Sequence, residues 1–191
     1  MKEFFAIVSL VLGFATFVPY FREMWRGTAK PHIFSWIPWT AMTGIAFWLS
    51  FTNGGGAGAW LFLLQAVGCG IVLLYAIFHG ERHITLLDRV TFTGTVLTII
   101  LYLFTKNALV SVVLASVIDT SAFIPTFRKS FLKPWEEPVL AYGISGFSYA
   151  FALLAVDTFS FVTALYGACL VLSNVVFVGF ALYRRRVLND S

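Results

Sequence analysis

The chain has 191 residues, of which 59% are hydrophobic and only 12% charged, and its formal net charge is +4. Soluble domains carry about 25% charged residues, so this composition excludes a disordered chain and argues against a soluble enzyme. A membrane-spanning helix needs about 20 apolar residues, which leaves room for seven short spans and no separate soluble domain. The Lys and Arg residues lie mostly in short connections, so we expect a lipid bilayer and no nucleic acid as partner.

Seven apolar runs follow one another along the chain. They cover residues 4–21, 34–51, 58–78, 84–104, 108–126, 138–155 and 159–183. Each run is apolar on all faces, as in membrane helices, and does not alternate as barrel strands do. We therefore predict an all-α polytopic membrane protein with seven transmembrane helices. The first run lacks a convincing cleavage site before Pro19, so we expect a mature helix rather than a signal peptide.

Positive charge falls almost entirely on one side of this predicted bundle. With alternate connections placed on the same side, that side holds Arg22, Arg26, Lys30, Arg82, Arg89, Arg128, Lys129, Lys133, Arg184, Arg185 and Arg186. The opposite side holds only Lys2 and Lys106. Basic connections face the cytoplasm, so we expect an external N-terminus and a cytoplasmic C-terminus. The short loops favour a bacterial inner membrane.

The second half of the chain resembles the first. Residues 17–22 read Phe-Val-Pro-Tyr-Phe-Arg and residues 123–128 read Phe-Ile-Pro-Thr-Phe-Arg, and a Lys-Pro pair follows each segment. Both segments lie at the basic side, so the two halves have the same orientation. Two parallel repeats of three helices need one linker helix between them. We predict a 3+1+3 arrangement with a first repeat, a linker helix and a second repeat at residues 1–80, 81–106 and 107–191.

This arrangement, with a proline near the inner end of the first helix of each repeat, resembles the SWEET and PQ-loop transporter superfamily, in its bacterial membrane-protein branch. Pro19-Tyr20 and Pro125-Thr126 stand where that family has Pro-Gln pairs, and residues 28–36 resemble its turn into the second helix. The resemblance implies a carrier that moves a small polar solute, such as a sugar, by alternating access. It also implies that prolines act as hinges, and the candidates here are Pro19, Pro38, Pro125 and Pro138.

Asp119 is the most informative single residue, because it lies inside an apolar run. An acidic side chain at that depth costs about 2.5–3.5 kcal/mol on insertion scales, so it should face a cavity or a partner. Ser116 lies three residues earlier, on roughly the same helix face. We predict that Asp119 and Ser116 contribute to a substrate site, with a structural hydrogen bond to a neighbouring helix as the alternative for Asp119.

Three more residues are candidates for the same site. Asn174 lies inside the last predicted helix, where the resemblance implies a substrate-binding Asn. Trp39 and Tyr142 lie deep enough in the second and sixth predicted helices to line a pocket, and their rings could stack on a sugar. Each also has a structural alternative, an interhelical hydrogen bond for Asn174 and packing for the rings. Trp36 fits an interfacial aromatic belt.

Several functional hypotheses remain open. The leading one is a facilitative solute carrier, and its variant is a proton-coupled carrier of an amino acid-like solute with Asp119 as the proton carrier. A non-transporting receptor on the same fold would instead bind a partner through its basic inner loops. The sequence shows no nucleophile–base pair, metal-ligand spacing or phosphate loop, so we expect neither enzymatic activity nor a metal or cofactor. Both a monomer and a homodimer are compatible with two repeats in one chain.

Overall fold

A computed structural model describes residues 1–81, 83–105 and 107–189. This part of the chain folds into seven α-helices and two short 3-10 helices and contains no β-strand. The α-helices are α1 (Lys2–Trp25), α2 (Ile33–Thr52), α3 (Trp60–His79), α4 (Leu86–Phe104), α5 (Ala108–Leu132), α6 (Val139–Leu154) and α7 (Phe161–Asn189). The 3-10 helices are η1 (Gly56–Ala59) and η2 (Pro134–Glu136). The all-helical prediction is confirmed.

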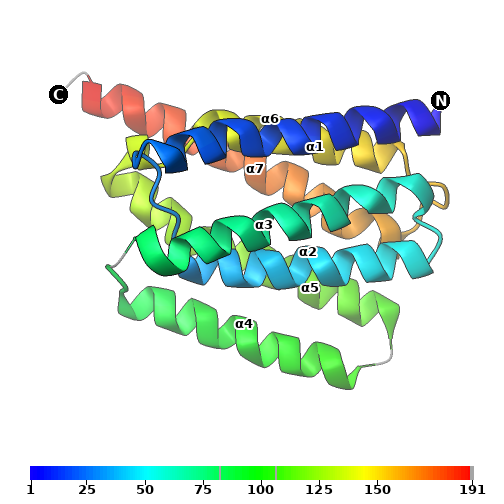
Figure 1. Ribbon diagram of the computed structural model, residues 1–191. Coiled ribbons are helices and arrows are strands. Elements are labelled where there is room, and N and C mark those ends of the chain that lie inside the picture. Colours follow the sequence, from blue (N-terminus) through cyan, green and yellow to red (C-terminus); the bar gives the residue numbers. More distant parts are fainter. Residues whose placement is uncertain (82, 106, 190–191) are drawn as a thin grey trace.

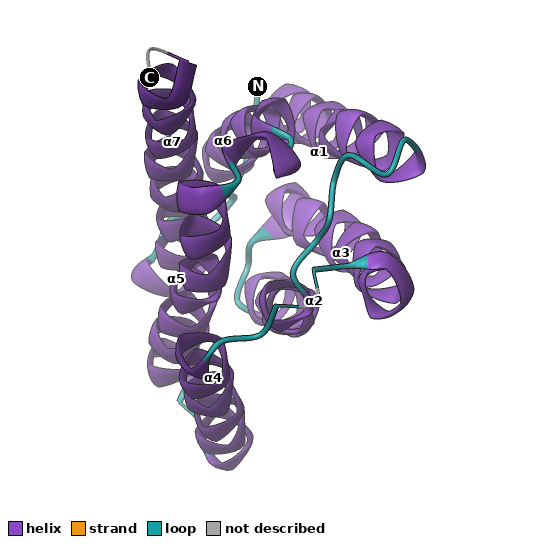
Figure 2. Cartoon of the chain, turned by 90° about the vertical axis from the view of Figure 1, so that its left-hand side faces the viewer, coloured by secondary structure: helices purple, strands orange, loops and turns teal. Residues whose placement is uncertain are grey.

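The α-helices run roughly along one common direction, and the two termini lie at opposite ends of the bundle (Figure 1). Helix α1 packs along α6, and α2 lies between α3 and α5. Helix α7 packs against both α5 and α6. Helix α4 contacts α5 and the edge of α2, so it lies at the rim of the bundle, far from α1 and α6 (Figure 2). The six other α-helices are therefore the ones that enclose the interior.

Four segments are long and apolar enough to cross a membrane. They are Lys2–Trp25, Gly56–His79, Ala108–Leu132 and Phe161–Asn189. Helix α6 is apolar but has only 16 residues. Helix α2 carries Pro38 together with several Trp, Ser and Thr residues, which lower its hydropathy. The four long apolar helices indicate an integral membrane protein.

The outward face of α1 shows why this bundle belongs in lipid. Large apolar side chains recur there every three or four residues and are each more than half exposed: Phe4, Ile7, Val11, Phe14 and Val18. In water such a stripe would be unfavourable, whereas lipid tails solvate it. The opposite face of α1 buries Ser9, Gly13 and Thr16. The helix is therefore apolar toward its surroundings and partly polar toward its neighbours, as a lipid-embedded bundle requires.

Several helices extend further at the basic end than predicted. Helix α1 continues to Trp25, α5 to Leu132 and α7 to Asn189, so the Arg184, Arg185 and Arg186 run lies inside α7 and does not close it. A helix need not end where the apolar run ends, and basic residues in a last turn interact favourably with the helix dipole. The predicted charges Arg82 and Lys106 lie outside the described residues.

The prolines divide into two groups. Pro19, Pro38 and Pro125 lie inside α1, α2 and α5, where a proline removes one backbone hydrogen bond and bends the helix. Pro138 instead is the residue that precedes α6. The prediction of a hinge within the sixth helix is therefore wrong for Pro138, because a proline at a helix start displaces no intrahelical bond.

Candidate functional site

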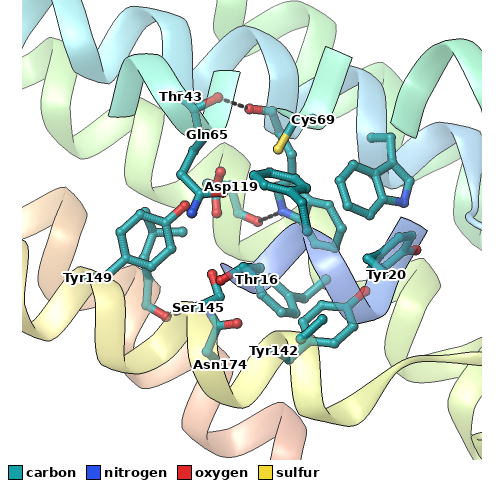
Figure 3. A pocket seen from close by; sticks show the side chains of 16 residues that line it. Thr16, Tyr20, Thr43, Gln65, Cys69, Asp119, Tyr142, Ser145, Tyr149 and Asn174 are labelled. Atoms are coloured by element: carbon teal, nitrogen blue, oxygen red, sulfur yellow. Dashed lines mark hydrogen bonds between the residues drawn. The ribbon is translucent and has the colours of Figure 1, made fainter. Parts of the chain in front are cut away.

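A small cavity lies near the middle of the bundle and receives side chains from α1, α2, α3, α5, α6 and α7. The space open to the centres of water molecules is about 60 Å³, which corresponds to about four waters. Its polar lining comprises Thr16, Tyr20, Thr43, Gln65, Asp119, Tyr142, Ser145, Tyr149 and Asn174. Figure 3 shows Gln65 and Asp119 reaching it from one side, and Ser145 and Asn174 from the other. The cavity is the place where polar groups of all six helices converge.

Asp119 is almost completely buried and lines this cavity. Its Oδ1 accepts a hydrogen bond of 2.8 Å from the Tyr166 hydroxyl, which holds the carboxyl group in place. Its Oδ2 has no hydrogen-bond partner in the described part of the chain. The indole Nε1 of Trp39 donates to the backbone oxygen of Asp119 at 3.3 Å, so α2 and α5 meet at this level. A buried carboxylate oxygen without a partner is costly and therefore marks a place where a solute or a water is expected.

Two further polar groups at the cavity are buried. The Gln65 Nε2 amide has no hydrogen-bond partner among residues 1–81, 83–105 and 107–189. The Tyr20 hydroxyl interacts with the side chains of Trp36 and Tyr142. Gln65 lies on α3 and Tyr20 on α1, so the two atoms face the cavity from different helices. Neither Gln65 nor Tyr20 is among the site residues predicted from the sequence. The signal that could have found Gln65 is the cost of burying an amide inside an apolar run.

The cavity includes most of the predicted site residues. Asp119, Asn174, Trp39 and Tyr142 all line it, although they lie on α5, α7, α2 and α6. The Asn174 amide donates to the Leu170 backbone oxygen at 2.8 Å, which orients the side chain. Ser116 does not line the cavity, and its hydroxyl donates to the Val112 backbone oxygen at 2.7 Å. Ser116 and Asp119 are three residues apart, so their side chains point in directions that differ by about 60° around the helix axis. This difference is enough to turn the serine away from the cavity.

Aromatic rings form the wall on the basic side of the cavity. Trp36 and Trp39 meet edge to face at 5.1 Å between centroids, and Trp36 meets Tyr20 at 5.0 Å. Phe123 meets Trp39 at 4.8 Å, and Tyr142 lies 6.2 Å from Phe123. Trp36 is buried in this cluster, so its prediction as an interfacial belt residue is wrong. A separate apolar cluster lies beyond the opposite side of the cavity, and its members Tyr149 and Leu170 line the cavity.

The basic end of the bundle is closed by a buried ion pair. Lys129 on α5 donates to Glu137 Oε1 at 2.7 Å and to the backbone oxygens of Lys30 and Glu136 at 2.6 and 3.2 Å. Glu137 Oε2 accepts from the Tyr142 hydroxyl at 3.0 Å, which connects the pair to the cavity wall. Arg185 on α7 donates to the Glu137 backbone oxygen at 2.8 Å. One pair thus joins α5, α6, α7 and the connection between α1 and α2.

A second buried cluster fixes α4 to α5 at the same end. Asp88, in the first turn of α4, accepts hydrogen bonds from Arg128 Nη2 at 2.9 Å and Nε at 3.2 Å. It also accepts from the backbone amide and the hydroxyl of Thr85, each at 2.8 Å. The His32 Nε2 lies 3.4 Å from Asp88 Oδ2, yet neither ring nitrogen has a hydrogen-bond partner within the described ranges. Asp88 thus connects the first turn of α4 to α5.

His32 gives the basic end a pH dependence. Burial lowers the pKa of the imidazole below 6.5, and Arg128 and Lys129 act in the same direction, while Asp88 and Glu81 oppose them. The unfolded chain therefore binds a proton more readily than the folded one, so His32 favours the folded state above pH 6.5 and this contribution is lost as the pH falls through its lower folded pKa.

We expect the thermal unfolding temperature in detergent to fall between about pH 7 and pH 5, and to fall less in His32→Gln. His83→Gln is the matched control, since His83 is exposed, and its pH profile should follow that of the wild type. Equal pH profiles for wild type and His32→Gln would contradict the assignment.

The other end of the bundle is closed by loops. Lys2 on α1 donates to the Asp157 backbone oxygen at 2.8 Å, and the Thr158 amide donates to Gly54 at 3.2 Å. Gly54 and Gly56 have positive φ values of 83° and 54° and lie against Thr158 and Asp157, so a side chain there would be strained and crowded. The turn between α2 and α3 therefore packs directly on the α6–α7 loop.

No group of three His, Cys, Asp or Glu side chains in the described ranges is placed to hold a metal ion. Cys69 lines the cavity as a buried free thiol, and Cys169 is a half-buried free thiol. The site's chemistry therefore rests on a carboxylate, amides, hydroxyls and aromatic rings. Comparison of the chain with protein-family models, curated proteins and solved structures yields no match.

Proposed function

We propose that the protein is a membrane carrier that binds a small polar solute in the central cavity and moves it by alternating access. One observation carries this proposal: Asp119 Oδ2 and Gln65 Nε2 are buried at one cavity with no hydrogen-bond partner in the described residues. Polar atoms in lipid-embedded protein are normally satisfied, so two unpaired ones at one cavity point to a bound solute. The closed ends and the small volume fit an occluded state of a carrier.

The helix contacts support two related halves, in the SWEET-like 3+1+3 arrangement. If α1, α2 and α3 correspond to α5, α6 and α7, each contact in one half should have a counterpart. The contact between α1 and α3 corresponds to the contact between α5 and α7, and the contact between α2 and α3 corresponds to that between α6 and α7. Between the halves, the contact of α1 with α6 corresponds to the contact of α5 with α2. Helix α4 has no counterpart and lies at the rim. The cavity then lies between two triplets, and residues 81–106 act as the linker.

Alternating access needs parts that bend and ends that open. Pro19, Pro125 and Pro38 lie inside the helices that form the contacts between the two triplets, which is where hinges would act. The Lys129–Glu137 pair closes the basic end, and the Lys2–Asp157 contact closes the other. Opening one end while the other stays closed would expose the cavity to one side at a time.

The same proposal includes an orientation and a location. Lys30, Arg128, Lys129, Lys133 and Arg185 gather at one end of the bundle, and basic residues favour the cytoplasmic side. The N-terminus would then lie outside and the C-terminus inside, in a bacterial inner membrane. Six helices of one chain line the cavity, so a monomer would suffice for transport and a homodimer would add no lining residue.

A receptor on the same fold receives less support. That hypothesis assigns partner binding to free cations in the basic inner loops. In the structure Arg128 pairs with Asp88, Lys129 with Glu137 and Lys133 with Glu81. These cations already hold the bundle together, so fewer remain for a partner. The central cavity would also have no role in a receptor.

Counterflow in proteoliposomes tests the carrier directly. Labelled sugars, amino acids and small amines are offered to wild type and to Asp119→Asn, with and without a pH gradient. We expect one class of solute to exchange, and Asp119→Asn to reduce the rate at least about tenfold, since it removes the charge at the site. Dependence on the gradient would identify proton coupling.

Glu3→Gln is the matched control, because Glu3 is an exposed acid in the first turn of α1, away from the cavity and from both closing contacts, and should leave the rate unchanged. A folded wild-type protein that exchanges no solute would overturn the carrier and leave the receptor hypothesis.

A further inference from the structure

The cavity has an unbalanced charge. Among the described residues that line it, Asp119 is the only acidic side chain, and no Lys, Arg or His lines it. The buried cations near the basic end, Lys129 and Arg128, are already paired with Glu137 and Asp88. An ionised carboxylate in this position is therefore without a counter-charge. Breaking or omitting one partner of a buried pair costs several kcal/mol, so a counter-charge that enters the cavity would be strongly favoured.

The hydrogen bonding of Asp119 leaves Oδ2 free for a positively charged partner. Tyr166 donates to Oδ1, a bond that a carboxylate accepts at full strength. Oδ2 is buried, unpaired and at the cavity. Oδ2 is therefore available as an acceptor for a solute bound in the cavity. A solute that brings a positive charge, with or without an N–H group, would satisfy it.

The remaining walls suit a cation that carries methyl groups. Seven aromatic residues line the cavity: Phe17, Tyr20, Trp36, Trp39, Phe123, Tyr142 and Tyr149. Trp36 and Trp39 stand at 90° to each other, so their faces point in different directions around the cluster. Aromatic faces attract organic cations, and desolvated sites of this kind bind methylated ammonium groups. Sugars would need more hydroxyl partners than such a wall offers.

Size narrows the class further. The cavity offers about 60 Å³ to the centres of water molecules, which is room for about four waters. A solute of that size has few non-hydrogen atoms. The charge, the aromatic walls and the volume therefore point to the same kind of molecule.

We propose that the solute is a small organic cation of the methylated-ammonium class, held between the Asp119 carboxylate and the rings of Trp36, Trp39 and Tyr142. This inference rests on the carrier function proposed above and specifies its substrate class. Gln65 and Asn174 would then contact a polar substituent or a water that accompanies the cation. Proton coupling is not required, because the cation itself neutralises the site.

The test compares tetramethylammonium with tert-butanol, a neutral molecule of similar size and shape. Binding to the purified protein in nanodiscs is measured by calorimetry, and uptake of labelled tetramethylammonium is measured in proteoliposomes with an inside-negative potential. We expect tetramethylammonium to bind at least about tenfold more tightly than tert-butanol and to be driven in by the potential. Asp119→Asn should remove that preference, Asp119→Glu should retain part of it, and Glu3→Gln, which changes an exposed acid in the first turn of α1, should leave it unchanged.

The outcomes separate this inference from the carrier function. If a sugar or a neutral amino acid exchanges in counterflow while tetramethylammonium neither binds nor competes, the cation class is wrong and the carrier stands. If no solute of any charge binds or exchanges, both are wrong. If tetramethylammonium binds equally well to wild type and to Asp119→Asn, the assignment of Asp119 is wrong.

Discussion

Replacing Lys129 by methionine should lower the free energy of unfolding by about 3–5 kcal/mol, because it leaves Glu137 as a buried charge without a partner. Lys129 and Glu137 are both almost fully buried, with 2.7 Å between Nζ and Oε1. The substitution also removes the donor that the backbone oxygens of Lys30 and Glu136 share. Unfolding in detergent, followed by heat or by denaturant, measures the change.

Two comparisons make this result specific to the buried pair. Lys133→Met removes a half-exposed cation that lies 3.5 Å from Glu81, so its cost should stay within about 1 kcal/mol. The double variant Lys129→Met with Glu137→Gln removes both charges and should recover part of the loss. A Lys129→Met protein as stable as the wild type would show that the pair does not hold the basic end closed.

Replacing Asp88 by alanine should lower the free energy of unfolding by about 3 kcal/mol, the second largest effect on stability. Asp88 is completely buried, whereas Arg128 is 20% exposed, so the freed guanidinium can reach solvent and the cost stays at the low end. The substitution removes four hydrogen bonds that Arg128 and Thr85 donate. We expect α4 to become more accessible first, because this cluster fixes its start to α5.

Hydrogen exchange and thermal unfolding together measure this prediction. Amides of α4 should lose protection more than those of α2 or α6 in Asp88→Ala. Glu3→Ala, which changes an exposed acid in the first turn of α1, is the control and should change neither observable. Uniform loss of protection over all helices would contradict a local role for Asp88.

The membrane class and the helix count could be predicted from the sequence because they depend on local properties. Apolar runs that do not alternate define membrane helices wherever they occur, and each run was found as one helix. The ends were less well predicted, as the six-residue extension of α5 from 126 to Leu132 shows. A helix can continue beyond the bilayer through polar residues. Hydropathy therefore indicates where the apolar run ends but not where the helix ends.

The candidate site divides in the same way. Asp119 and Asn174 could be predicted as site residues because a polar group is costly inside an apolar run, and this cost depends only on the residue and its neighbours in the sequence. Ser116 and Tyr20 could not be assigned this way, because a single step along a helix turns a side chain by about 100°. Whether it faces a cavity, a neighbour or lipid depends on how each helix is rotated in the bundle.

A helical membrane protein with basic connections, interior prolines and an acid inside an apolar run could be predicted from local pattern. These features follow from composition and from the length of each apolar run, which need no knowledge of neighbours. The packing of the helices determines that Lys129 pairs with Glu137, that Gln65 and Asp119 line one cavity, and that Ser116 lies outside it. These outcomes depend on contacts between helices far apart in the sequence, which are set by packing and not by local pattern.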